Sequence, residues 1–93
     1  MEKFFYRVES GDTVFALSRR FNIPVTIIIK LNNLKCEIEQ GDLLYLERGQ
    51  YRIYKVRPFE SAESVAQKFN TTPQKILSDN GVEYLFYGLT IMV

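Results

Sequence analysis

Residues 6–22 read YRVESGDTVFALSRRFN, and residues 54–70 read YKVRPFESAESVAQKFN. The two stretches align without a gap, and both begin with Tyr and end with Phe-Asn. The correspondence continues beyond them in three pairs: Ile28 with Ile76, Asn32 with Asn80 and, after one residue drops out of the second copy, Gly41 with Gly88. The chain therefore consists of two copies of one repeated unit.

Each copy predicts the same opening elements, a strand followed by a helix. In the first copy, the alternation of Tyr6 and Val8 indicates a strand, and Asp12 or Thr13 is a typical helix cap. Apolar residues then recur at i, i+3 and i+7 in both copies, with small Ser18 or Ala66 at i+4, which is typical of an amphipathic helix with one buried face. An Asn at the end of each stretch tolerates the left-handed conformation in which helices often stop.

A second helix and a closing strand complete each copy. The helix is predicted to begin at Pro24 or Val25 in the first copy and at Pro73 in the second, because proline is favoured at the first helical position. The closing strands are predicted over residues 43–46 and 90–93. The sequence thus predicts an α+β fold of two βααβ repeats.

Residues 47–50 are expected to link the repeats, which divides the chain into units 1–47 and 48–93. Units of this size are marginally stable without disulfides or metals, and the chain has one Cys and no His. We therefore expect packing between the repeats to stabilise them. We also expect four aromatic residues to supply much of the burial: Tyr6, Phe21, Tyr54 and Phe69.

The composition excludes several classes of protein. The 93 residues are 46% hydrophobic with a formal net charge of +1, which argues against a disordered chain and against a protein that neutralises nucleic-acid phosphates. The lack of His removes catalysis by a His base and Cys/His zinc sites, so no metal or cofactor is expected. No signal peptide or apolar run of membrane-spanning length is visible, and no membrane partner is expected.

The order of motifs resembles the LysM domain, a carbohydrate-binding module. The first copy carries Tyr6-x-Val8, Gly11-Asp12-Thr13, Ala16-Leu17-x-x-x-Phe21, Asn32-Asn33-Leu34 and Gly41-Asp42-x-Leu44. The second copy matches less well, since Phe59-Glu60-Ser61 replaces Gly-Asp-Thr. The resemblance implies that each repeat packs two helices on one face of a two-stranded antiparallel sheet.

In this family the sugar lies in a shallow groove between the first strand–helix loop and the loop after the second helix. Such a groove suits an N-acetylated sugar, because a glycine lets the backbone approach, a helix start offers free N–H groups and apolar residues seat the methyl group. Carried over to the first copy, the binding residues are Gly11, Asp12, Thr13, Val14, Phe15, Leu31, Asn33, Leu34, Lys35, Cys36 and Ile38. The Cys36 thiol is expected to be partly buried and inert.

The second copy offers a weaker version of the same groove. Its residues are Phe59, Glu60, Ser61, Ala62, Gly81, Val82, Glu83 and Tyr84. Phe59 stands where the first copy has Gly11, and its ring is expected to fill the groove. Carboxylate pairs such as Asp12 with Glu9 are interpreted as ordinary surface charges, because glycoside hydrolysis needs two carboxyls across a cleft.

The resemblance implies a non-catalytic bacterial module that binds polysaccharides containing N-acetylglucosamine. Peptidoglycan is the favoured ligand and chitin the second. The expected location is the cell envelope or cell wall. The alternative is a protein–protein interaction or assembly module of the same fold without sugar binding, whose partner is a second copy or another protein. Exposed residues within 27–29 and 84–87 favour packing against the other repeat or against a second chain. A third possibility is a targeting fragment of a larger hydrolase.

Overall fold

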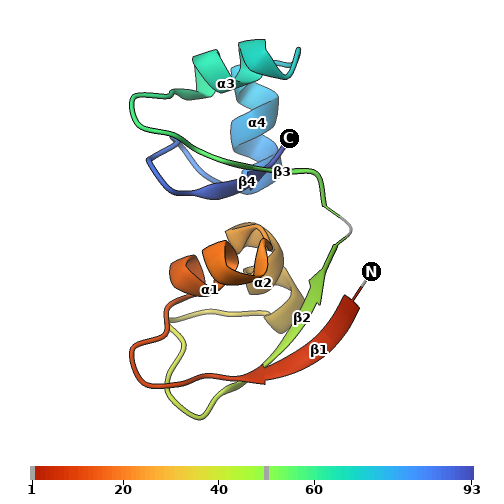
Figure 1. The fold of residues 1–93 in the computed structure, drawn as a ribbon, viewed down its shortest axis with the longest axis vertical. Helices are drawn as coiled ribbons and strands as arrows, with labels where there is room; N and C mark the ends of the chain where they lie inside the picture. Colours follow the sequence, from red (N-terminus) through yellow and green to blue (C-terminus); the bar gives the residue numbers. More distant parts are fainter. Residues whose placement is uncertain (1, 50) are drawn as a thin grey trace.

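The computed structural model describes residues 2–49 and 51–93 and contains two βααβ repeats arranged one above the other (Figure 1). The α+β class and the order of elements in both repeats are as predicted. The elements are β1 (Glu2–Arg7), α1 (Val14–Phe21), α2 (Val25–Asn32), β2 (Leu43–Arg48), β3 (Ile53–Lys55), α3 (Ala62–Lys68), α4 (Pro73–Asn80) and β4 (Thr90–Met92).

Each repeat has its own two-stranded antiparallel sheet, β1 with β2 and β3 with β4. In the first sheet the register runs from Glu2 opposite Arg48 to Arg7 opposite Leu43. Strand β2 therefore includes the first two residues of the predicted link 47–50, while Gln50 lies outside the described residues. The helices pack on one face of each sheet, and each repeat has a separate apolar core.

The helix ends follow from local chemistry. Thr13 caps α1 by accepting a hydrogen bond from the N–H of Ala16 at 3.0 Å, and Asn22 ends that helix with a φ of 59°. Pro73 is the first residue of α4, as predicted, with Thr72 as its cap. Helix α2 begins at Val25, the second of the two predicted starts, and Pro24 is the cap residue before it.

The four aromatic residues expected to supply much of the burial are only half-buried. Tyr6 packs edge-on against Phe21 with ring centroids 5.5 Å apart, and Tyr54 packs on Phe69 in the same way at 5.1 Å. The residues that are almost completely buried are mainly aliphatic, such as Leu17. The rings border each core rather than filling it.

The second repeat places the outer face of its sheet against helices α1 and α2 of the first. Phe15 and Val25 of these helices pack against the core of the second repeat. The hydroxyl of Thr26 donates a hydrogen bond to the carbonyl of Asn80, and Lys55 Nζ donates to the carbonyl of Arg19 at 3.4 Å. The expected packing between repeats is therefore present.

This packing changes the exposure of equivalent positions. Thr90 on β4 is 1% exposed, whereas Leu43, its counterpart on β2, is 53% exposed. The run 27–29, which was expected to contact the other repeat or a second chain, is not among the residues that pack against the second core. Ile27 and Ile28 pack in the core of their own repeat, and Ile29 is exposed. No helix among residues 2–49 and 51–93 is long and apolar enough to cross a membrane.

Candidate functional site

A groove of about 480 Å³ lies in the first repeat, between the start of α1 and the loop that follows α2. Three of its residues come from the cap and first turn of α1, and Ile29 contributes from α2. The loop supplies the opposite wall. The lining residues are Thr13, Val14, Phe15, Ile29, Leu34, Lys35, Cys36, Glu37 and Ile38.

Seven of the eleven predicted residues line this groove, and four do not: Gly11, Asp12, Leu31 and Asn33. The structure gives three of these a conformational role. Gly11 has a φ of 87° in the turn before α1, and Asn33 ends α2 with a φ of 50°. The Asp12 carboxylate accepts hydrogen bonds from the Tyr6 hydroxyl at 2.6 Å and the Glu9 N–H at 2.8 Å. It holds the loop that carries Thr13.

The groove has apolar walls with a charged residue of each sign in the loop. Val14, Phe15, Ile29, Leu34 and Ile38 form a surface that suits the methyl group and C–H faces of an acetylated sugar. Cys36 is a free, exposed thiol in this wall, which corrects the expectation that it is partly buried.

A smaller groove of about 180 Å³ occupies the equivalent place in the second repeat. Its lining residues are Glu60, Ser61, Ala62, Glu63, Leu77, Glu83, Tyr84 and Leu85. Of the predicted residues, Phe59, Gly81 and Val82 are not in this lining. Phe59 is fully exposed, so its ring does not fill the groove as expected. It keeps a φ of 66°, a conformation that suits the glycine of the first repeat.

Sequence reasoning missed the contribution of the second helix of each repeat. Ile29 lines the first groove and Leu77 lines the second, and these two residues are equivalent in the repeat. Glu37, Glu63 and Leu85 also line the grooves, and all three lie within the loop and helix-start segments that the resemblance assigns to them. The alignment of the two copies carries a signal for the helix pair, because both positions are apolar. The motifs that predict the groove, however, cover only the loops and the start of the first helix.

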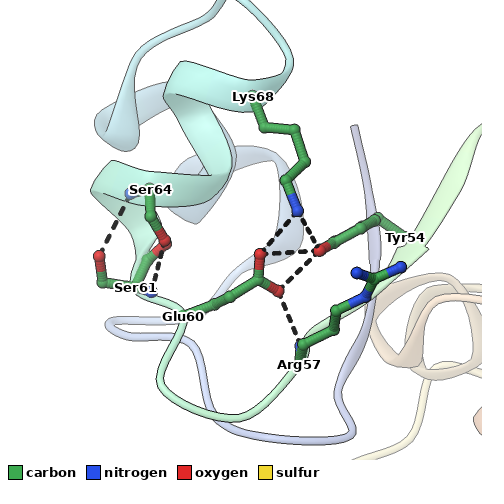
Figure 2. A network of polar contacts seen from close by, with 6 residues as sticks. All are labelled: Tyr54, Arg57, Glu60, Ser61, Ser64 and Lys68. Carbon is green, nitrogen blue, oxygen red and sulfur yellow. Dashed lines mark hydrogen bonds and ion pairs between the residues drawn. The ribbon is translucent and has the colours of Figure 1, made fainter.

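A polar network anchors the groove loop of the second repeat (Figure 2). The Tyr54 hydroxyl lies 2.7 Å from both carboxylate oxygens of Glu60, and Lys68 Nζ donates to Glu60 at 2.9 Å and to Tyr54 at 2.7 Å. The Arg57 N–H also donates to Glu60 at 2.8 Å. These bonds engage both oxygens of the Glu60 carboxylate, one of the residues predicted for the second groove.

The first repeat has the equivalent network of Tyr6, Asp12 and Arg20. Arg20 donates to the Tyr6 hydroxyl at 3.3 Å, and that hydroxyl donates to Asp12. The hydrogen bond from Tyr6, with a second from the Glu9 N–H, lowers the pKa of the Asp12 carboxyl. Both carboxylates are thus engaged in holding the loop, a more specific role than the ordinary surface charges expected from the sequence.

Glu60→Gln is expected to lower stability at neutral pH and to make unfolding less sensitive to acid. Hydrogen bonds from Lys68, then from the Arg57 N–H and Tyr54, lower the pKa of Glu60 from 4.5 to about 2. A lowered pKa stabilises the fold above pH 4.5, and this contribution is lost as the pH falls from 4.5 to about 2. Urea unfolding of both proteins across this range should show their stabilities converging at the acid end.

Glu63→Gln is the matched control, because Glu63 lies close by in the first turn of α3 but outside the network in Figure 2. An unchanged difference between wild type and Glu60→Gln from pH 7 to pH 2 would contradict the predicted role of the ionised carboxylate.

The fold and its grooves define a class of small tandem modules, each a βααβ unit with a shallow groove between the same two loops. The family model for the LysM domain matches residues 6–45 and 54–83, and the chain belongs to that family. Membership supports carbohydrate binding as the activity of the fold.

Several known proteins are similar to this chain. It is 28% identical over 93 aligned positions to the probable peptidoglycan endopeptidase LytE of Bacillus subtilis, covering 84% of this chain. It is 29% identical over 92 positions to the N-acetylmuramoyl-L-alanine amidase sle1 of Staphylococcus epidermidis, covering 88% of this chain. The matched region spans 28% of the length of each relative.

Among solved structures, the spore cortex-lytic enzyme SleL of Bacillus cereus aligns over 100% of this chain and 23% of its own, with a TM-score of 0.49 and 23% identity.

Proposed function

We propose that this protein is a non-catalytic module that binds N-acetylglucosamine-containing glycan, peptidoglycan in the first place, through the groove of its first repeat. The observation that carries the proposal is the groove of about 480 Å³, which lies inside a segment matched to the LysM domain. Its aliphatic and aromatic walls suit an acetamide methyl group, and Lys35 and Glu37 offer polar partners for sugar hydroxyls.

The cell wall is the proposed place of action. The relatives are named as a peptidoglycan endopeptidase and an N-acetylmuramoyl-L-alanine amidase, and both names refer to bonds of the bacterial cell wall. Because the matched region is a minor part of each relative, we propose that the shared part attaches a protein to its polymer. The second repeat, with the smaller groove, is the weaker binder in this scheme.

Ile29→Glu is expected to weaken binding of an N-acetylglucosamine tetramer by at least about tenfold, because a carboxylate in the apolar wall must lose hydration when the sugar binds. Titration followed by backbone amide shifts measures the affinity and locates the site. In wild type the shifts should concentrate at residues 13–15, 29 and 34–38. Pull-down with insoluble peptidoglycan tests the same variant on the polymer.

Leu43→Glu is the matched control. Leu43 is also an exposed aliphatic residue, but it lies on β2 outside the groove, so its substitution should leave binding unchanged. Wild-type protein that responds neither to millimolar tetramer nor to peptidoglycan would refute the proposed function.

The second candidate is the assembly module, and one observation favours it. The outer face of the β1–β2 sheet carries exposed Phe5 and Leu43 beside Tyr45, whereas the equivalent face of the β3–β4 sheet is covered by the first repeat. In this alternative a second copy of the chain is the partner. Sedimentation equilibrium tests this alternative. An apparent mass that rises with protein concentration in wild type but stays constant in Phe5→Lys would support assembly. A constant monomer mass for wild type would exclude it.

A further inference from the structure

Three aromatic rings form a line from the groove of the first repeat to the groove of the second. Phe15 lines the first groove, and its ring centroid lies 5.7 Å from that of Phe86. The Phe86 ring lies 6.2 Å from that of Tyr84, which lines the second groove. We call Phe15, Phe86 and Tyr84 the aromatic ridge. It makes the two grooves parts of one continuous surface.

The ridge is both open and firmly supported. Phe86 is 43% exposed and Tyr84 is 68% exposed, so a ligand can reach both rings. The Arg19 guanidinium lies over the Phe15 ring, with its carbon 5.8 Å from the ring centroid. The backbone at Gly88 also approaches Phe15, since a Cβ on that glycine would lie 3.4 Å from the ring. These contacts hold the Phe15 end of the ridge between the two repeats.

The repeat alignment shows that this arrangement is specific to the second copy. Phe86 corresponds to Ile38, which lines the groove of its own repeat. Phe86 is not in the lining of the second groove and instead packs on Phe15 of the first repeat. Tyr84 corresponds to Cys36, so both substitutions add an aromatic ring on the side where the grooves meet. Exposed aromatic surface of this kind is typical of a binding surface.

We propose that the aromatic ridge is a sugar-binding subsite that lets one N-acetylglucosamine-containing strand occupy both grooves at once; this proposal rests on the proposed function. Aromatic faces carry negative partial charge, and the C–H bonds on one face of a pyranose ring complement it. None of the three ridge side chains carries a carboxylate or an ammonium group, which suits a neutral polysaccharide backbone. Glu63 and Glu83 in the second groove can accept hydrogen bonds from sugar hydroxyls.

The consequence is a dependence of affinity on ligand length. A tetramer fills one groove, whereas an octamer bound in the first groove continues over the ridge into the second. Binding of the same strand in the second groove is then intramolecular. The high effective concentration of the strand at that groove raises the overall affinity even though the groove is small. The ridge makes two unequal sites act as one long site.

Isothermal titration with N-acetylglucosamine tetramer and octamer tests this proposal. For wild type the octamer is expected to bind one-to-one and about tenfold more tightly than the tetramer, which corresponds to about 1.4 kcal/mol. Phe86→Ala should reduce the octamer's advantage to the statistical gain that a longer ligand has in a single groove. Tyr87→Ala is the matched control, because Tyr87 is an exposed aromatic of the same loop outside the ridge, and it should preserve the tenfold ratio.

The variants separate the ridge from other effects of ligand length. A longer ligand also offers more registers in a single groove, but that statistical gain persists in Phe86→Ala. If Phe86→Ala fails to fold, Phe86→Leu keeps apolar contact with Phe15 and removes the ring. An octamer-to-tetramer ratio that is the same in wild type and Phe86 variants overturns the ridge and leaves the proposed function standing. Absence of tetramer binding to wild type overturns the proposed function itself.

Discussion

Asn80→Ala is expected to destabilise the protein by about 3 kcal/mol, because it removes three hydrogen bonds made by a buried side chain, two of them to the backbone of Met92. Asn80 is only 3% exposed. Its Nδ2 donates to the carbonyls of Ile76 at 2.8 Å and Met92 at 3.0 Å, and its Oδ1 accepts from the Met92 N–H at 2.7 Å. One side chain therefore joins the end of α4 to β4. Urea unfolding at neutral pH measures the loss.

Asn32→Ala is the matched comparison in the first repeat. Asn32 makes the same three bonds, to the Ile28 carbonyl and to the carbonyl and N–H of Tyr45. It is half-buried, so water can replace part of what the substitution removes, and the expected loss is about 1 kcal/mol. Equal losses at the two sites would show that burial does not set the cost. A loss below about 0.5 kcal/mol at Asn80 would contradict the structural role of this residue.

The repeat in the sequence predicted most of the fold, because equivalent residues perform equivalent local tasks. Asn32 and Asn80 align in the two copies, and each donates a hydrogen bond to the carbonyl four residues earlier in its helix. Thr13, Ser61 and Thr72 cap the helices that follow them. These interactions depend on neighbours a few residues away, so the pattern of residue types is enough to predict them.

The candidate groove could be predicted only in part, since it depends on how the loops fold back over the helices. Gly11 and Asp12 belong to the motif that suggested a site, but their roles in the structure are a backbone turn and a loop anchor. Ile29 lines the groove, whereas its neighbour Ile28 on the same helix is buried in the core. Periodicity does not say which apolar residue at the edge of a helix borders a groove and which enters the core.

The contact between repeats was least accessible to sequence reasoning. The need for it was predicted from the small size of each unit, and the segments 27–29 and 84–87 were expected to contact the other repeat or a second chain. Of these, Phe86 does pack on Phe15 of the first repeat, whereas the run 27–29 is not among the residues packed against the second core. Phe15 was assigned to the groove alone. How two units are oriented depends on side chains far apart in the sequence, and no local pattern encodes it.

Gly88→Leu is expected to destabilise the protein by about 3 kcal/mol, with contributions from a left-handed backbone and from overpacking. Gly88 has a φ of 88°, which a residue with a Cβ adopts at a cost. Its Cα also faces the Phe15 ring and the Arg19 guanidinium, at 3.4 Å and 3.8 Å from the position of a Cβ. A leucine there must push the repeats apart or displace both side chains.

Gly41→Leu isolates the part of this loss that comes from packing between the repeats. Gly41 is the equivalent glycine, with a φ of 96° and an N–H that donates to Val8, as the N–H of Gly88 donates to Val56. A Cβ on Gly41 meets nothing within 4 Å, so its substitution should cost only the backbone penalty of about 1–2 kcal/mol. Urea unfolding of both variants measures the difference. Equal losses would mean that the repeats are not packed at Phe15, and a single groove would then be the largest unit able to hold a glycan.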